Sequence, residues 1–192
     1  LLLLSLLVAW SLGTFEVGLA LRAEGELSLG PKETGIMFVE CMVVMGLTQL
    51  LVFNRWFPAA HTRLLLAPGF ILLAGGLLLV GRASSAQELF LAVAALSAAA
   101  GILSPVIAFW TSLAAKNVQG RGLGWQTSAA SFGQAAGSAA GGALLGVPFL
   151  GGPFLIAAFL SISAAMLAAP LSGKLAALSH RSSRGLVSQL SR

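Results

Sequence analysis

The sequence is dominated by long apolar runs that carry almost no charge. Hydrophobic residues make up 57% of the 192 residues and charged residues 9%, whereas a typical soluble domain is about 25% charged. An apolar run of about 20 residues is long enough to cross a bilayer as a helix. The composition therefore predicts an all-α integral membrane protein embedded in a lipid bilayer. Six runs qualify as transmembrane helices, at about residues 1–21, 34–53, 64–81, 88–111, 124–146 and 154–171, and residues 173–192 form a basic tail.

The titratable residues exclude several kinds of site. The chain has no Asp, and Cys41 is its only cysteine, so neither a disulfide nor a cysteine metal site can form within the chain. We expect Cys41 to be a buried, small apolar residue. His61 and His180 both lie outside the apolar runs, and no zinc-protease or serine-nucleophile motif is present. We therefore expect no enzyme activity, no metal and no cofactor. The net charge of +5 is scattered between apolar runs, which argues against nucleic acid as a partner.

The run 124–146 differs from the others because it is uncharged but rich in Gly, Ala and Ser. Gly133, Gly137 and Gly141 recur every four residues and therefore lie on one face of a helix. In a bilayer, small residues allow two helix backbones to approach closely. We expect this face, with Ser138 and Gly142, to be a helix-packing motif that lies against a bundle outside this chain.

Lysine and arginine are distributed unevenly between the two expected sides of the membrane. Eight lie in the connectors 54–63 and 114–121 and in the tail, and three lie on the opposite side. Since Lys and Arg favour the cytoplasm and six spans return the chain to its starting side, we expect both ends to be cytoplasmic. The expected host is a plasma membrane, the inner membrane of a bacterium. Leu1 already lies in an apolar run, so we expect a fragment of a longer protein, with a secretory signal as the alternative.

Polar side chains are concentrated in four of the six runs. Runs 64–81 and 154–171 are almost wholly apolar and can face lipid, whereas the others carry polar groups that should face a cavity or a partner. Gln134, Gln49 and Ser104 are therefore candidates for contact with a substrate in such a cavity. For Gln134, a hydrogen bond between helices is an equally good interpretation.

Two carboxylates, Glu16 and Glu40, lie well inside the first and second runs. Each is about five or six residues from the expected outer boundary, a depth of roughly 8–9 Å at ~1.5 Å per residue. Two carboxylates at one depth on adjacent helices can share a proton or bind a cation. We therefore treat both as candidates for proton coupling. The alternative is that each carboxylate reaches the outer interface or forms a local hydrogen bond.

Other residues are expected to serve structure. Trp110 and Trp125 lie near predicted cytoplasmic helix ends, where Trp commonly anchors a helix at the membrane interface. The residues Ser85 to Glu88 form a capping-box pattern that should start the fourth helix. Pro31 suits the first turn of the second helix.

Residues 133–142 resemble the antiporter motif GxxxGPxxGG of the major facilitator superfamily, with Ser138 in place of its Pro. Residues 117–124 are similar to the loop that enters the eleventh helix of such drug:proton antiporters, and residues 29–35 to the segment that opens the eighth. The whole chain then resembles helices seven to twelve, the C-terminal half of a transporter. The superfamily's loop motif is not intact between the second and third runs, where only Arg55 and Arg63 match its basic positions.

The resemblance implies a function. In the superfamily the seventh, eighth, tenth and eleventh helices line or flank the cavity, which agrees with the distribution of polar residues above. It implies a secondary active transporter, with proton-coupled efflux of small molecules by alternating access against a missing N-terminal six-helix half. Uptake of a sugar or metabolite, and a six-helix membrane module that transports nothing, are the alternatives.

Overall fold

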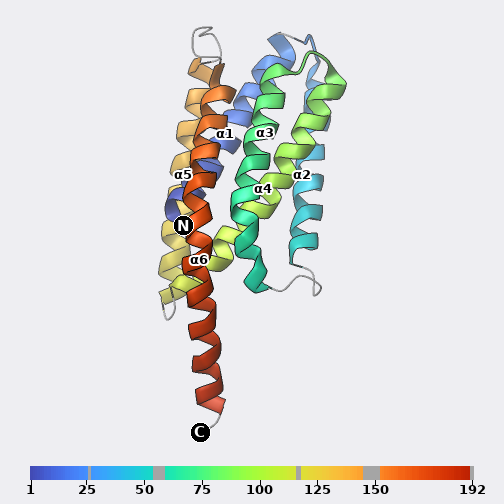
Figure 1. Cartoon of the computed structure of the whole chain (residues 1–192). Coiled ribbons are helices and arrows are strands. Elements are labelled where there is room, and N and C mark those ends of the chain that lie inside the picture. Colours follow the sequence, from blue (N-terminus) through green and yellow to red (C-terminus); the bar gives the residue numbers. More distant parts are fainter. Residues whose placement is uncertain (26, 54–58, 116–117, 145–151, 191–192) are drawn as a thin grey trace.

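The computed structural model describes residues 1–25, 27–53, 59–115, 118–144 and 152–190 (Figure 1). In these ranges the chain forms helices and no strand, so the all-α prediction is confirmed. The helices are α1 (Leu2–Gly25), α2 (Pro31–Val52), the 3-10 helix η1 (Ala59–Leu65), α3 (Leu66–Arg82), α4 (Ala86–Ala114), α5 (Gln119–Leu144) and α6 (Gly152–Leu190).

Five stretches of the described chain are long and apolar enough to cross a membrane, which agrees with an integral membrane protein. They are Leu2–Gly25, Pro31–Val52, His61–Arg82, Ala86–Ala114 and Gly152–Gly173. The remaining long helix, α5, has 26 residues but is not among these five stretches. The basic tail continues α6 as a helix to Leu190 and projects beyond the bundle (Figure 1).

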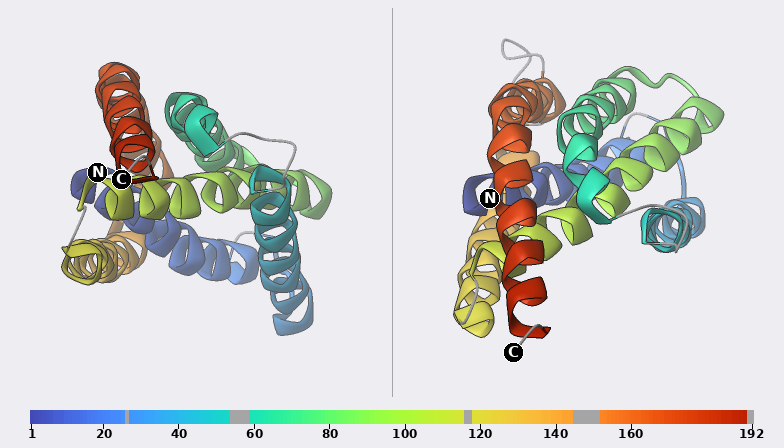
Figure 2. Two further views of the ribbon diagram at one scale, coloured as in Figure 1. Left: turned by 90° about the horizontal axis from the view of Figure 1, so that it is seen from below. Right: turned by 60° about the horizontal axis from the view of Figure 1, so that its bottom comes forward.

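The helices pair in a pattern that repeats between the two halves of the chain. The main pairs are α1 with α5, α2 with α4, α3 with α6 and α3 with α4, and α1 also contacts α6. Exchanging the first three helices with the last three, in order, maps α1–α5 onto α2–α4 and α3–α4 onto α1–α6, and it leaves α3–α6 unchanged. Figure 2 shows the result as three layers, with α3 and α6 on one side of α1 and α4, and α2 and α5 on the other.

The pair α1 and α5 is held at close range by the glycines of the helix-packing motif. A Cβ atom at Gly133 or Gly137 would collide with the backbone of Leu6 or Trp10, and one at Gly141 would lie 2.9 Å from the carbonyl oxygen of Thr14. Both series advance by four residues in the same direction, so the two helices run parallel. The hydroxyl of Thr14 also donates to the carbonyl of Gly137 at 3.1 Å. We expected this face to meet a bundle outside the chain; in the structure α1 lies there instead.

The other members of the motif are placed differently. Ser138 lies at the same contact, because a Cβ atom at Gly13 of α1 would lie 2.9 Å from both its amide nitrogen and its hydroxyl. Gly142 is exposed, and a Cβ atom there would meet only the side chain of Val17 at 3.7 Å. The tight contact therefore involves three of the four glycines of the motif.

The pair α2 and α4 has a related but smaller contact. A Cβ atom at Gly101 of α4 would lie 2.8 Å from the carbonyl oxygen of Met45 of α2. When the two halves of the chain are exchanged, the crossing of α4 and α2 at Gly101 corresponds to the crossing of α1 and α5 at Gly13. The residues of α2 are mostly exposed or half-buried, and its buried residues are Met37, Cys41 and Val52. The prediction of a buried Cys41 is confirmed.

The ends of the helices are closed by specific hydrogen bonds. At the start of α4 the amide of Glu88 donates to the hydroxyl of Ser85, and the carboxylate of Glu88 accepts from the amide of Ser84 at 2.7 Å, so a capping interaction forms as predicted. Pro31 occupies the first turn of α2, also as predicted. At the end of α3, the Arg22 guanidinium donates to the carbonyls of Val80 and Ala83. This side chain therefore joins α1 to the C-terminus of α3.

One expected interface residue lies in the core. Trp110 has 0% exposure, and its indole nitrogen donates to the hydroxyl of Thr62 at 3.0 Å. The prediction that Trp110 anchors the chain at the membrane interface is therefore wrong; it joins α4 to η1, because a buried indole requires a hydrogen-bond acceptor. Trp125 is 60% exposed.

We predict that Gly137→Ala destabilises the protein by about 1–3 kcal/mol, because the added methyl group must push α5 away from α1. The matched control is Gly142→Ala, where the methyl group has room. Thermal unfolding of the purified protein in detergent measures both. Equal stability of the two variants would show that the backbones do not approach as described.

A second prediction concerns the joint between α1 and α3. Arg22→Met removes both hydrogen bonds to the end of α3 and should lower the free energy of unfolding by about 1.5–3 kcal/mol. Arg82→Met, an exposed arginine in the last turn of α3, should change it by less than about 0.5 kcal/mol. Denaturant titration compares the two, and a neutral effect of Arg22→Met would contradict the assigned role.

Candidate functional site

A cavity of about 260 Å³ lies between α1, α4 and α5. The glycine contact positions one wall, because it fixes α5 directly against α1, and α4 closes the other side. Two of the three predicted substrate contacts, Gln134 and Ser104, line this cavity. The complete lining is Ser5, Val8, Ala9, Leu12, Ser104, Ile107, Gln126, Thr127, Ala130, Ser131 and Gln134.

The hydroxyl groups of the lining lack the hydrogen bonds that other helical hydroxyls make. Elsewhere a serine or threonine usually donates to the carbonyl four residues earlier, as Ser11, Ser97 and Ser161 do at 2.6–2.9 Å. In the part of the chain that the structure describes, no side-chain hydrogen bond is formed by the four lining hydroxyls. These are Ser5, Ser104, Thr127 and Ser131.

The amide of Gln126 adds an unsatisfied acceptor to the same wall. Its Oε1 atom is buried and makes no hydrogen bond with any described residue. A buried polar atom without a partner is unfavourable, and such atoms in native proteins usually bind water or a ligand. The lining thus offers hydroxyl groups, and none of the residues that form it is charged.

Gln134 connects the cavity to one of the predicted carboxylates. Its Nε2 atom donates to Oε2 of Glu16 at 3.1 Å. An ionised carboxylate only accepts hydrogen bonds, so the amide must turn its NH2 group toward Glu16. The alternative interpretation of Gln134, a hydrogen bond between helices, is thus observed between α1 and α5. The same side chain lines the cavity, and its contact with a substrate stays a prediction.

The remaining candidates lie on α2, away from the lining. Gln49 is in the last turns of α2 and does not line the cavity. Glu40 does not line it either, and its Oε2 atom is buried without a hydrogen-bond partner among the described residues. No hydrogen bond joins the carboxylates of Glu40 and Glu16 within the described chain.

Sequence reasoning missed four of the polar lining residues. The predicted substrate contacts did not include Ser5, Gln126, Thr127 or Ser131. A signal existed, because the polar positions 127, 131 and 134 on α5 follow the three-or-four-residue spacing of one helix face. Within the described residues no group of three His, Cys, Asp or Glu side chains is placed to hold a metal ion.

Comparisons of the chain with protein-family models, with curated proteins and with solved structures give no match.

Proposed function

We propose that this chain is one six-helix half of a secondary active transporter that couples solute movement to protons by alternating access. The observation that carries the proposal is the polar cavity between α1, α4 and α5, whose lining residue Gln134 is hydrogen-bonded to Glu16. Polar groups inside a membrane bundle are unfavourable unless they are paired, and those that face a cavity often mark a pathway for a solute or an ion. The resemblance of residues 133–142 to an antiporter motif supports the same assignment.

The repeated pairing of helices supports a transporter architecture. Many transporters are built from inverted repeats, with the solute site near the membrane midplane where the repeats meet. A repeat of three spans is necessarily inverted, because an odd number of crossings reverses the direction of the next unit. Here the cavity is formed by α1 from the first unit and by α4 and α5 from the second.

The proposal requires α5 to cross the membrane, although its composition alone does not select it. The small face of α5 contacts α1 at three successive positions, from Leu6 to Thr14, so α5 follows a helix that is itself apolar enough to span. The polar residues that lower its hydropathy include those that face the cavity. A helix of this composition is therefore compatible with the membrane when its polar side is covered.

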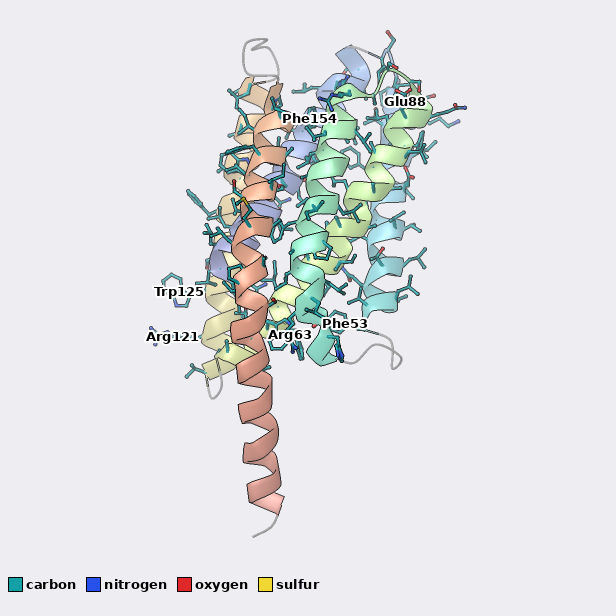
Figure 3. All side chains as sticks on the ribbon, in the orientation of Figure 1. Phe53, Arg63, Glu88, Arg121, Trp125 and Phe154 are labelled. Atoms are coloured by element: carbon teal, nitrogen blue, oxygen red, sulfur yellow. The ribbon has the colours of Figure 1, made fainter. Side chains whose placement is uncertain are left out.

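The two ends of the bundle differ in charge, as expected when one end faces the cytoplasm and the other does not. Figure 3 shows Arg63 and Arg121 at one end and Glu88 at the other. The projecting end of α6, which belongs to the basic tail, is on the side of Arg63 and Arg121 (Figure 3). We assign this side to the cytoplasm, since Lys and Arg favour it.

Glu16 and Gln134 supply a physical mechanism for coupling. When Glu16 is ionised, it accepts from Nε2 of Gln134, and Oε1 of that amide is available to accept from a solute. When Glu16 takes up a proton, its hydroxyl can donate to Oε1 after the amide rotates by half a turn, and the NH2 group then faces the cavity. Protonation thus changes the hydrogen-bonding character of the site without placing a charge in it.

We predict that Glu16→Gln abolishes proton coupling but preserves solute exchange. The complete protein containing this chain is reconstituted in vesicles with a trapped pH-sensitive dye, and neutral, cationic and anionic solutes are added in turn. Solute-driven proton movement should fall at least tenfold in the variant, whereas counterflow of the same solute continues. Glu24→Gln, an exposed carboxylate two turns further along α1, is the matched control and should retain both activities.

Two results would contradict the proposal at different levels. Coupling that survives in Glu16→Gln would remove this carboxylate from the mechanism. Wild-type vesicles that move no solute of any charge class would refute the transporter function itself.

A separate experiment tests whether α5 crosses the membrane. Cys41 is buried and is the only cysteine, so single cysteines can be introduced at Val118 and Ala143 in a Cys41→Ala background. A membrane-impermeant maleimide added to intact cells should label Ala143→Cys, and should label Val118→Cys only after permeabilisation. Labelling of both from the same side would show that α5 does not span.

A further inference from the structure

A second concave surface, a groove of about 410 Å³, runs along α6 beside α3. These two helices form one of the main pairs of the bundle (Figure 1). Leu155, Phe159 and Ile162 recur with the spacing of one helix face, so the groove follows the axis of α6 for about 10 Å. Its complete lining is Leu78, Leu155, Ile156, Ala158, Phe159 and Ile162.

The groove opens to the surroundings of the bundle. Leu155, Phe159 and Ile162 are 47%, 68% and 45% exposed. All six lining residues belong to stretches that are apolar enough to span a membrane, so the groove faces lipid in a bilayer. The six side chains are all hydrocarbon. Such a groove suits a hydrocarbon chain, whereas a polar solute would lose its hydrogen bonds to water there without replacing them.

A positively charged side chain lies at one end of the groove. Arg82 follows Leu78 by four residues and is therefore on the same face of α3, one turn further along. A Cβ atom at Gly81 would lie 3.2 Å from the Cβ atom of Phe154, so the last turn of α3 packs beside the first turn of α6. The groove thus begins, at Leu155, at the level of Arg82. This arginine is exposed and forms no hydrogen bond or ion pair with the described residues.

Other charges at this end of the groove also favour an anion. The Arg22 guanidinium lies there, where it donates to two carbonyls of α3. The positive end of the α6 dipole is here too, and the first turn of α6 has no acidic residue. Glu24 lines a separate cavity beside α2, and Glu88 accepts hydrogen bonds from Ser84 at the start of α4. Arginine binds phosphate with matching geometry, so a phosphate group suits this position.

We propose that this groove binds one anionic phospholipid, with an acyl chain along Leu155, Phe159 and Ile162 and the phosphate group at Arg82. A phospholipid joins both chemistries of the site in one molecule, and the surrounding membrane supplies it. The lipid would contact α3 from the first three-helix unit and α6 from the second, so its binding should stabilise the folded bundle. The inference does not depend on the proposed function.

The first experiment measures binding. The complete protein that contains this chain is purified in detergent and stripped of lipid, and its melting temperature is followed as phosphatidylglycerol, phosphatidylcholine or glycerol 3-phosphate is added. Phosphatidylglycerol should raise the melting temperature saturably. Phosphatidylcholine should require a mole fraction about fivefold higher, because its headgroup brings a cation beside two arginines. Glycerol 3-phosphate should have no effect, because it has no acyl chain.

Two variants with matched controls separate the headgroup from the chain. Arg82→Met should raise the half-maximal mole fraction of phosphatidylglycerol about fivefold, and without lipid it should melt as the wild type does. Arg121→Met, an exposed arginine at the other end of the bundle, should leave that fraction unchanged (Figure 3). Phe159→Ala should raise the fraction about threefold for both lipids, because the chain loses apolar contact. Phe132→Ala, which is equally exposed at 68% but lies on α5, should not.

A second experiment locates the lipid without any substitution. Phosphatidylglycerol with a photoreactive diazirine on one acyl chain is added at its half-maximal mole fraction, the sample is irradiated, and the labelled peptides are mapped. Labelling should concentrate on residues 155–162. The peptides that carry Leu50 of α2 and Leu91 of α4 report ordinary contact with lipid, since both side chains are 72% exposed.

Three outcomes would overturn the inference. Labelling spread evenly over α2, α4 and α6 would show that lipid contacts the groove no differently from the rest of the surface. Equal half-maximal fractions for the two lipids, or for Arg82→Met and the wild type, would refute the headgroup site. Stabilisation by glycerol 3-phosphate equal to that by phosphatidylglycerol would show a phosphate site that does not use the groove. None of these measurements involves transport, so their failure is distinguishable from failure of the proposed function.

Discussion

The close contact between the backbones of α1 and α5 determines most of what is distinctive in this protein. Gly133, Gly137 and Gly141 present no side chain, so α1 comes within direct contact of their backbone. Hydrophobic segregation cannot hold two helices together in lipid, because lipid tails are as apolar as the side chains. Close packing and the hydrogen bond from Thr14 to Gly137 take its place. This contact positions Gln134 opposite Glu16 and holds the polar side of α5 beside α4.

The sequence predicted the elements well because membrane crossing leaves a strong signal. The expected runs 34–53 and 64–81 differ by a few residues from α2 (Pro31–Val52) and α3 (Leu66–Arg82). The continuation of α6 to Leu190 was not predicted, since hydropathy reports the membrane span and not the helix. The composition of α5 was interpreted as a crossing because of its length, but its small and polar residues leave it outside the apolar stretches.

The partners of individual side chains were less predictable than the helices. The spacing of the glycines indicates a close-packed face, but spacing alone does not identify the helix that covers it. Gly13 is the residue of α1 that lies against Ser138 of α5, and its small size was the feature of the sequence that pointed to α1. Gln134 and Ser104 were found from their polarity within apolar runs, whereas Gln49 satisfies the same criterion and lies elsewhere. Trp110 was misassigned because an aromatic residue near a helix end suits the interface and the core equally, and only its contact with Thr62 separates the two.

In the proposed transporter, two different residues bind the proton and contact the solute. Glu16 takes up the proton, and Gln134 forms the hydrogen bond with the solute. A carboxylate within the lining would alternate between charged and neutral states, and a neutral solute would respond weakly to that alternation. Gln134 lies between the Glu16 carboxylate and the solute. Protonation of Glu16 changes which end of the Gln134 amide faces the solute, so that a hydrogen-bond acceptor is replaced by a donor. Such an exchange discriminates between solutes, because a group that accepts a hydrogen bond from the NH2 end of the amide cannot pair in the same way with its oxygen end. The absence of ionisable residues from the lining and the presence of a carboxylate one amide away are therefore two parts of the same proposed mechanism.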